Sequence, residues 1–289
     1  MSFRRAQVQD AIFVRILVPL KLVPDPDNAN KIRVSDDNQR LDICSMEQKA
    51  NPFDEYALEA ALRLTEDGRA PRARQGEIVV VSLGSSETEV MLRAGLATGA
   101  DRAFRIATSD DALDAGRVAH VLSRLAAQES CDLVLMGKQS VDGDSNEVGQ
   151  RIAAMLGWPQ VTFASKILAH SESRLEVERE IDGGIQRVLV ALPAVITVDL
   201  RIVAPDAVRS KLTSEDFQYA PGVRFAPLPA IMQARRKQLS IVELDAFGPL
   251  PKRTMRYMRY ELPTSKAGGR VVSTPSELVR LLASEAKVL

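Results

Sequence analysis

Short, uninterrupted apolar runs alternate with segments of helical periodicity through the first half of this chain. The runs have the length of strands and occupy residues 12–20, 77–83, 102–106 and 132–136. Between them, apolar residues recur at helical spacing over residues 54–64, 87–97 and 112–127. Continuous Val and Ile runs are typical of strands buried on both faces. The pattern predicts an α/β fold, with a Rossmann-like, mostly parallel sheet and helices on both of its faces.

The pattern changes after Trp158, where strand-like segments follow one another without helices. These segments span residues 160–168, 174–181, 186–192 and 194–200, and the run from Asp182 to Gly184 marks a tight turn. Residues 204–229 are rich in Pro, Gly, Ser and Asp, which predicts an irregular loop before a short basic helix at 231–238. A last helix is expected at 277–286, with Thr274 as its N-cap and Glu277 completing a capping box.

Reactive side chains are scarce. The chain has 289 residues but only two His and two Cys, and these four lie far apart in the sequence: His120, His170, Cys44 and Cys131. A disulfide framework, a Cys/His zinc site and a His-dependent hydrolase are therefore excluded. With 38 basic and 38 acidic residues, the chain has no net attraction to nucleic acid. No apolar run approaches the roughly 20 residues of a membrane helix, and the N-terminus lacks the apolar core of a secretory signal.

The polar loop GKQSVDGDSNEVGQ, residues 137–150, lies between a predicted strand and a helical segment. Ligands of open α/β sheets bind beyond the carboxyl ends of strands. We expect Gly143 to allow a sharp turn and Ser145 or Asn146 to cap the helix, whose first amides attract phosphate. Lys138 adds positive charge. An ordinary capped turn explains the loop equally well.

Two carboxylates of this loop, Asp142 and Asp144, would repel a phosphate placed against them. They are better suited to accept hydrogen bonds from ribose hydroxyls or from backbone amides. The spacing of Asp142, Asp144 and Asn146 resembles the start of an EF-hand loop, but Glu147 stands where that loop needs Gly, and Ala153 where it needs Glu. A calcium site is therefore rejected.

A second polar turn opens the first helical segment, where Pro52 stiffens the entry and Asp54 suits a helix N-terminus. Capping alone accounts for this turn as well as ligand binding does. Neither turn is a Walker loop or a dinucleotide fingerprint.

Several separated stretches resemble the small, or beta, subunit of electron transfer flavoprotein. NPFDEYALEAALRL (residues 51–64) resembles the first nucleotide turn and helix of this family, and residues 137–150 with LGWPQVTFAS (156–165) resemble the second. VEREIDGG (177–184) and LPAVITVDLR (192–201) together resemble the family signature, and AGLATGADR (94–102) also matches. The resemblance covers roughly residues 15–237.

The resemblance implies a heterodimer with a larger alpha subunit that holds most of a redox-active FAD. The small subunit would bury an AMP of structural role. Carried over by motif, the AMP contacts fall at the ends of two predicted strands and in the two polar turns. They are Pro19, Asn51, Pro52, Phe53, Asp54, Leu83, Gly137, Lys138, Gln139, Asp142, Gly143, Asp144, Ser145, Asn146, Glu147 and Val148.

The resemblance also implies protein partners. Arg179 and Glu180 correspond to a charged pair that faces the mobile FAD domain. Leu228 corresponds to the anchor of a loop that docks onto acyl-CoA dehydrogenases, with Pro229, Ile231 and Met232 beside it. A quinone oxidoreductase would take the electrons. The chain would then be an electron carrier without catalytic side chains, located in the cytoplasm, or in the mitochondrial matrix of a eukaryote.

With this resemblance, four parts of the chain are expected. Residues 1–12 form an N-terminal extension and residues 13–203 the nucleotide-binding domain. Residues 204–238 hold an inserted loop and the docking segment, and residues 239–289 form a C-terminal arm and helix that wrap the partner subunit.

The sequence departs from the family pattern at several points. Residues 204–223 look like an insertion before the docking segment. Gln233 and Arg236 stand where lysines are common, and Val148 replaces a hydroxyl residue that helps to hold the AMP phosphate.

Two alternatives remain. Some bifurcating relatives bind a second FAD in place of AMP, and the loop around Asp142 and Asp144 resembles theirs, whereas Lys138, Gln139 and Asn146 resemble the AMP-binding type. The other alternative is a homodimer of the universal-stress type that binds ATP without flavin.

Overall fold

The computed structural model describes residues 14–43, 45–69, 73–171, 173–264 and 268–289. Contacts group the chain into two units: a main unit of Met1–Ile32 with Ile43–Arg256, and a smaller unit of Arg33–Asp42 with Tyr257–Leu289. Each unit is described by itself.

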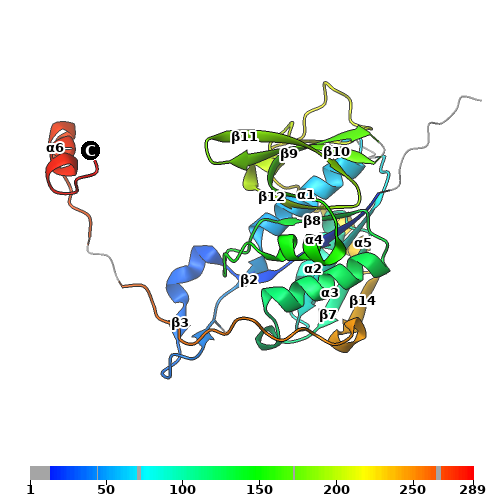
Figure 1. The fold of residues 1–289 in the computed structure, drawn as a ribbon, viewed down its shortest axis with the longest axis horizontal. Coiled ribbons are helices and arrows are strands. Elements are labelled where there is room, and N and C mark those ends of the chain that lie inside the picture. The colour runs from blue at the N-terminus through cyan, green and yellow to red at the C-terminus, as the bar shows by residue number, and fades with distance from the viewer. Residues whose placement is uncertain (1–13, 44, 70–72, 172, 265–267) are drawn as a thin grey trace, which may run out of the picture. The chain divides into compact units, whose positions relative to one another are not determined.

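The main unit contains most of the regular structure (Figure 1). Its strands are β1 (Arg15–Pro19), β2 (Leu22–Pro24), β5 (Gln48–Ala50), β6 (Glu77–Gly84), β7 (Arg102–Ala107), β8 (Leu133–Gly137), β9 (Gln160–Ser171), β10 (Arg174–Ile181), β11 (Gly184–Ala191), β12 (Ala194–Val198), β13 (Val208–Arg209) and β14 (Leu239–Glu243). Its helices are α1 (Pro52–Thr65), α2 (Thr88–Thr98), α3 (Ala115–Gln128), α4 (Val148–Leu156) and α5 (Leu228–Ala234), with short 3-10 helices at Pro26–Lys31, Asp110–Ala112, Leu200–Val203 and Leu244–Phe247.

One large sheet runs through the main unit in the order β11-β10-β9-β12-β8-β1-β6-β7-β14, and β13 pairs with β9. The strands from β9 to β14 along this order pair in parallel, whereas β10 and β11 are antiparallel additions at one edge. Asp182 and Gly183 form the turn between β10 and β11, with φ of 88° at Gly183. The predicted α/β fold with a mostly parallel sheet is confirmed.

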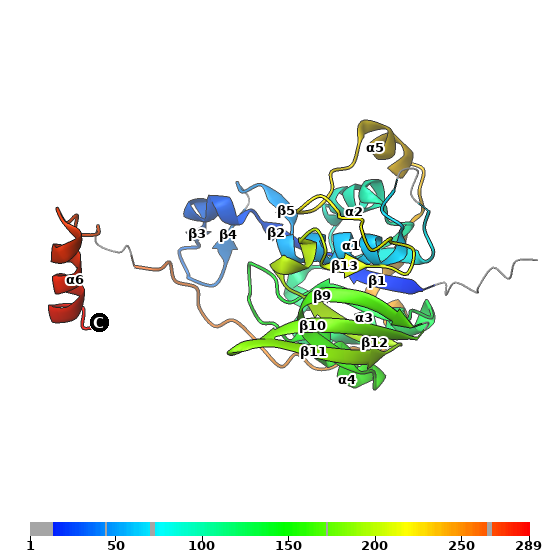
Figure 2. The ribbon, with the colours of Figure 1, turned by 90° about the horizontal axis from the view of Figure 1, so that it is seen from above.

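Helices cover both faces of the sheet (Figure 2), because successive strand residues point to opposite sides. On β1, Ile16 and Val18 are buried in one cluster with apolar residues of α1 and α2. Leu17, between them, is buried in another cluster with residues of α3 and α4. The central strands thus bury both faces, as their continuous apolar runs predicted.

The last strand of the sheet was not predicted. β14 pairs in parallel with β7, Leu239 opposite Ala103, although it falls in the segment assigned to the C-terminal arm. The residues of β14 are only partly buried or exposed, and Ile241 is among the exposed ones. A strand in such a position does not need the continuous apolar run of a central strand, and the sequence of β14 has none. The predicted strand at 194–200 ends earlier, at Val198. Residues 12 and 13 of the first predicted strand lie outside the described residues.

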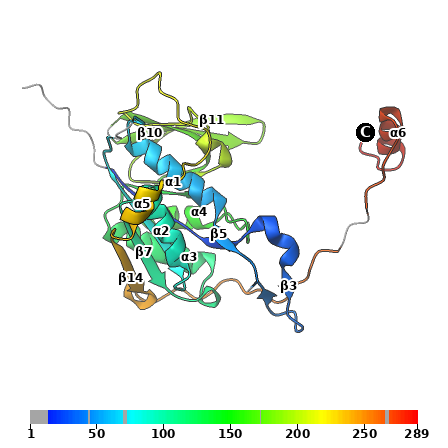
Figure 3. The ribbon, with the colours of Figure 1, turned by 180° about the vertical axis from the view of Figure 1, so that it is seen from behind.

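The predicted basic helix at 231–238 is displaced. Its observed counterpart, α5, begins at Leu228 and ends at Ala234. Pro229 occupies the first turn, where its missing N–H costs nothing. α5 lies next to α2 (Figure 3).

The smaller unit contains the hairpin of β3 (Arg33–Val34) and β4 (Leu41–Asp42) and the helix α6 (Pro275–Ser284). Tyr260 donates its backbone N–H to the Asn38 carbonyl across 2.9 Å. Thr274 caps α6, as predicted, by accepting a hydrogen bond from the Glu277 amide. The Glu277 side chain accepts from the amide of Ser273 rather than from that of Thr274.

Candidate functional site

The chain order reverses in the sheet at β1. From β1 the chain fills β6, β7 and β14 on one side, whereas β8 and β12 lie on the other. In open α/β sheets, ligands bind beyond the carboxyl ends of the two strands next to such a switch point, here β1 and β8. Pro19 is the last residue of β1 and Gly137 the last of β8. The loop 137–150 begins at the end of β8, and the turn at Asn51 is joined to the end of β1, because the Asn51 amide donates to the Lys21 carbonyl at 2.8 Å.

The Asn51 side chain joins the two turns. Its Nδ2 donates to the Gln139 carbonyl across 2.9 Å, and its Oδ1 accepts from the amide of Val141 at 3.1 Å. Asn51 is almost fully buried, so these bonds are shielded from water. Asn51 precedes α1, but its side chain does not cap that helix. Its function is therefore to hold the loop after β8, which the capping interpretation had missed.

Asp54, in the first turn of α1, is buried beneath the same turns. Its Oδ2 accepts the backbone N–H of Lys21 at 2.9 Å. Burial raises the pKa of the Asp54 carboxyl to about 7, although hydrogen bonds from the backbone of Lys21 and Gly137 and from Asn51 oppose the rise. The contact is close: a Cβ on Gly137 would lie 2.6 Å from the Asp54 carboxylate and from the Phe53 side chain.

Two lysines of the site are already paired with carboxylates. Lys21 Nζ contacts Asp142 at 2.6 Å, and Lys138 Nζ contacts Asp199 at 2.6 Å. Lys138 also lies over the rings of Phe53 and Phe163, 5.2 and 5.5 Å from their centroids. The charge of Lys138 is thus committed to Asp199, which leaves backbone amides as the donors for an anion.

Lys21, Asp199 and Phe163 were not predicted from the sequence. Lys21 directly follows the predicted strand 12–20, so its position was an available signal. Asp199 directly follows β12 but fell inside the predicted strand 194–200. Phe163 has φ of 59°, a rare value for an aromatic residue, and the β9–β12 pairing is irregular nearby. No pattern in the sequence predicts this backbone conformation at Phe163.

The loop from Gly137 to Glu147 differs in detail from the prediction. Its left-handed residues are Asp144 (φ 49°) and Asn146 (φ 45°), whereas Gly143 has an ordinary φ. Asp and Asn tolerate this region because they are short and polar. The Gln139 side chain donates to Asp144 across 2.8 Å. The predicted cap is wrong, because neither Ser145 nor Asn146 caps the helix and the N-cap residue is Glu147.

Among the described residues, no side chain caps the N-terminus of α1 or of α4. Asp114 caps α3 and Thr274 caps α6, whereas α2 and α5 also lack a side-chain cap. The first amides of a helix have no partner within it, so uncapped termini are open to a bound anion. α1 and α4 are the two helices that start from the paired turns at β1 and β8. Val148, the first residue of α4, is partly buried.

Leu83 is separated from the residues of the two polar turns. It lies inside β6, not after it, on the strand next to β1, and Pro19 pairs in register with Val81 two residues earlier.

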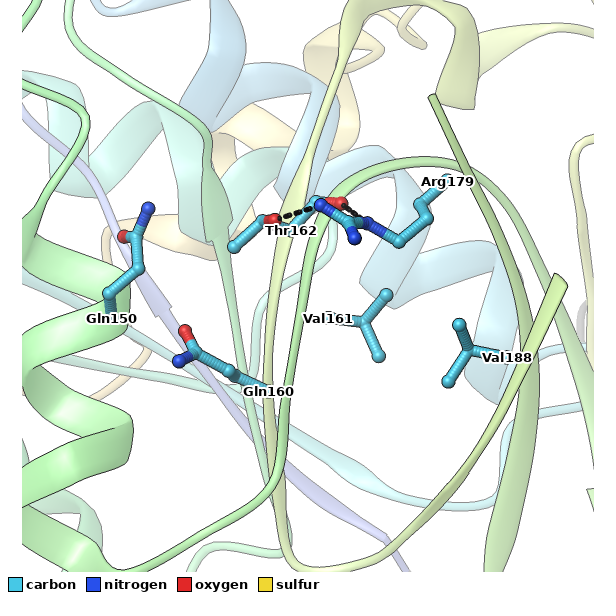
Figure 4. Close-up of a pocket in the computed structure, with 6 residues that line it drawn as sticks. All are labelled: Gln150, Gln160, Val161, Thr162, Arg179 and Val188. Carbon is cyan, nitrogen blue, oxygen red and sulfur yellow. Dashed lines mark hydrogen bonds between the residues drawn. The ribbon is translucent and has the colours of Figure 1, made fainter. Parts of the chain in front are cut away.

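Beside the turns lies a pocket of about 320 Å³ between α4 and strands β9–β11 (Figure 4). Gln150 and Gln160 line one side, and Val161 and Val188 another. Arg179 is held by Thr162, donating to its carbonyl at 2.9 Å and to its hydroxyl at 2.8 Å. The neighbouring Glu180 points to the opposite face of the sheet and accepts from Arg201 at 2.6 Å. Arg179 and Glu180 thus belong to two different surfaces.

The predicted docking residues lie in α5 and not on a loop. Leu228 is the first residue of the helix and Pro229 the second. Leu228, Ile231 and Met232 are all exposed. An exposed apolar group of this kind is typical of an interaction surface.

Of the His and Cys side chains, the structure describes those of His120 and Cys131. His120 Nε2 lies 3.3 Å from the Phe247 carbonyl, and burial raises the pKa of the Cys131 thiol to about 12. Cys44 and the His170 side chain lie outside the described parts. Within those parts, no group of three His, Cys, Asp or Glu residues could hold a metal, and no helix is long and apolar enough to cross a membrane.

Comparisons with known proteins agree with the predicted resemblance. Residues 44–247 match the family model of the electron transfer flavoprotein domain. The chain is 36% identical over 276 residues to the electron transfer flavoprotein subunit beta of Bradyrhizobium diazoefficiens, covering 96% of this chain and all of the relative.

Eukaryotic relatives are equally similar. The mitochondrial subunit beta of Oryza sativa subsp. japonica is 38% identical over 279 residues, with 96% of this chain and 100% of the relative covered. The human subunit beta is 36% identical over 272 residues, covering 93% and 96%. These relatives are electron-transfer proteins. This chain therefore belongs to the family of electron transfer flavoprotein beta subunits.

Proposed function

We propose that this chain is the small subunit of a heterodimeric electron transfer flavoprotein and binds a structural AMP at the β1–β8 switch point. The partner would be the alpha subunit, which holds most of the FAD. Family membership supports the subunit assignment. The observation that carries the nucleotide site is the Asn51 side chain, which ties the turn before α1 to the loop before α4 at 2.9 and 3.1 Å.

The residues at the switch point fit a nucleoside monophosphate. The uncapped N-terminus of α4 offers backbone amides to the phosphate, so Val148 need not supply a hydroxyl. Asp142 is neutralised by Lys21, and Asp144 accepts from Gln139, which leaves further carboxylate lone pairs for ribose hydroxyls.

The FAD supplies the redox chemistry when bound, and the chain's own residues help to bind and orient it. The rest of the assignment follows the family resemblance. Arg179 and Glu180 contact the FAD domain of the alpha subunit, and Leu228, Pro229, Ile231 and Met232 contact an acyl-CoA dehydrogenase as electron donor. Residues from 248 onward wrap the alpha subunit. A flavoprotein-quinone oxidoreductase accepts the electrons, in the cytoplasm or the mitochondrial matrix.

The different surroundings of Arg179 and Glu180 support a contact between Glu180 and the FAD domain that can form and break. Arg179 is immobilised on Thr162, whereas Glu180 pairs with the exposed Arg201. An exposed ion pair is weak, at most about 1 kcal/mol, so Glu180 can exchange Arg201 for another cation at little cost.

Co-expression with an alpha subunit, purification and denaturation of the complex test this proposal. The expected result is a flavin spectrum, with one FAD and one AMP released per heterodimer. Two FAD would instead identify a bifurcating subunit. A homodimer that releases ATP without flavin would overturn the subunit assignment and favour a universal-stress-type protein.

A further inference from the structure

A cluster of two buried acids, one buried arginine and one partly buried arginine joins α1 to the segment before α5. We call it the α1 clamp; it consists of Glu59, Arg63, Glu66 and Arg224. The Arg224 guanidinium contacts Glu59 at 2.7 Å and Glu66 at 2.7 Å, and its remaining N–H groups bond the same two carboxylates. Arg63 contacts Glu59 at 2.7 Å. Burial by itself raises the pKa of Glu59, but the bonds from Arg224 and Arg63 outweigh it and lower this pKa.

Arg63 extends the clamp to the predicted insertion. Its side chain is fully buried and donates to the carbonyls of Ala204 (2.7 Å), Ala220 (3.0 Å) and Gly222 (2.8 Å). Its guanidinium also lies over the Tyr219 ring, 4.8 Å from the centroid. The insertion is therefore fixed to α1 along its length, and the chain leaves it at a defined point, Arg224.

The far end of the docking segment is fixed as well. Arg93 of α2 donates to the carbonyls of Ala234 and Lys237, each at 2.8 Å. Lys237 Nζ donates in turn to Leu96 and Ala100 at the end of α2. Residues 225–233 thus lie between two anchored points, Arg224 and Ala234.

Between these points, four large apolar side chains face solvent. Phe225 is 92% exposed, Leu228 72%, Met232 55% and Ile231 44%. Phe225 directly follows Arg224, which is partly buried and held by the carboxylates of Glu59 and Glu66. A large aromatic side chain next to a residue that is fixed by ion pairs is pre-organised for binding, since less conformational freedom is lost when it docks. Two exposed arginines, Arg235 and Arg236, follow the same helix.

We propose that Phe225 is a second docking anchor beside Leu228, and that Arg224 is a positioning residue that holds Phe225 outward. The partner surface is an apolar pocket flanked by carboxylates, which complement Arg235 and Arg236. This inference rests on the proposed function, in which α5 contacts the electron donor. It adds Phe225 and the α1 clamp, neither of which the family resemblance indicated.

The test uses the purified heterodimer, with an acyl-CoA dehydrogenase and its acyl-CoA as electron source. Phe225→Ala should raise the KM for the flavoprotein roughly 10- to 30-fold, as expected for an aromatic anchor, with flavin content and reduction by dithionite unchanged. Val90→Ala, on the exposed face of α2, is the matched control and should leave KM unchanged. An unchanged KM in Phe225→Ala together with a raised KM in Leu228→Ala would overturn the inference about Phe225 but leave the docking function of α5 standing. If both variants behave as wild type, the docking function of α5 fails as well.

Arg224→Lys tests the positioning function, because it keeps the charge but loses the two-carboxylate contact. It should raise KM several-fold at unchanged flavin content. In a Phe225→Ala background it should have no further effect on KM, since Arg224 acts through Phe225. Additive effects, or a loss of flavin in step with activity, would show a merely structural function for Arg224.

The charge of the partner is tested by Arg235→Gln with Arg236→Gln. This double variant should raise KM at low salt and reduce the dependence of KM on ionic strength. If the salt dependence is unchanged, the partner pocket has no carboxylate rim.

Discussion

Lys138 and Asp199 form a 2.6 Å ion pair between the ends of adjacent strands β8 and β12, with Lys138 lying against Phe53 and Phe163. The one lysine of the loop 137–150 therefore already has a charged partner within the chain. Both side chains are largely shielded from solvent, so each depends on the other for compensation of its charge.

Replacing one member of this ion pair should lower the free energy of unfolding more than replacing both members. We expect Lys138→Met to lower the free energy of unfolding by about 3 kcal/mol, because it leaves Asp199 uncompensated. Lys138→Met with Asp199→Leu should recover about 1–2 kcal/mol of that loss. Urea unfolding of the four proteins in the cycle measures the coupling, and strictly additive costs would contradict it.

Asn51→Ala should loosen the loop after β8. Without its side chain the Gln139 carbonyl and the Val141 amide lose their buried partner, at a cost of about 1–3 kcal/mol. The AMP content of the purified heterodimer should fall while FAD is retained. Asn28→Ala is the control, since Asn28 bonds Asp25 in a 3-10 helix elsewhere. Full retention of AMP in Asn51→Ala would argue against a nucleotide site at these turns.

Gly137→Ala and Gly143→Ala form a matched pair within one loop. A Cβ on Gly137 would lie 2.6 Å from Asp54 and Phe53, so we expect a loss of about 1–3 kcal/mol and reduced AMP content. A Cβ on Gly143 meets nothing closer than Ser140 Oγ at 3.8 Å, and φ there is ordinary. Gly143→Ala should therefore be nearly neutral in thermal unfolding. Equal effects would mean that crowding at Gly137 is unimportant.

The raised pKa of Asp54 predicts that the stability of the folded chain depends on pH. Its pKa is about 7 in the folded chain and about 3.9 when unfolded, so the folded state binds the proton more tightly. Its contribution to stability is therefore complete below about pH 4 and is lost as pH rises towards 7. Relative to wild type, Asp54→Asn should gain about 2–3 kcal/mol in unfolding free energy between pH 5 and pH 7.

The control for this experiment is Asp114→Asn. Burial alone raises the pKa of Asp114, but amide hydrogen bonds from Arg117 and Thr254 lower it below its usual value. With its pKa lowered, Asp114 stays ionised between pH 5 and pH 7, so its variant should differ from wild type by a constant amount over this range. A constant difference for Asp54→Asn as well would show that Asp54 is not protonated near neutral pH.

Leu228→Ala should weaken electron uptake from the donor. Removing most of an exposed apolar side chain costs the free chain little stability but removes a contact with the partner. We expect KM for the flavoprotein to rise about tenfold or more, with flavin content unchanged. Stopped-flow reduction by the acyl-CoA-reduced dehydrogenase measures this effect directly. Loss of flavin in this variant would contradict an anchor at Leu228.

The sequence by itself determined the sheet and its helices, because strands buried on both faces need continuous apolar runs, as in residues 77–83 and 132–136. It also located the loop 137–150, which directly follows such a run, and the turn at Asn51, which opens a segment of helical periodicity. β14 was missed because an edge strand that is only half buried has no such pattern.

Only the tertiary structure decided how the turns are used. Asn51 and Gln139 are 88 residues apart, and no local pattern shows that their contact replaces a helix cap. The same holds for Lys138 with Asp199 and for Arg224 with Glu59. Side-chain partners far apart in the chain are set by the order of strands, which follows from how the whole core packs and not from any single segment.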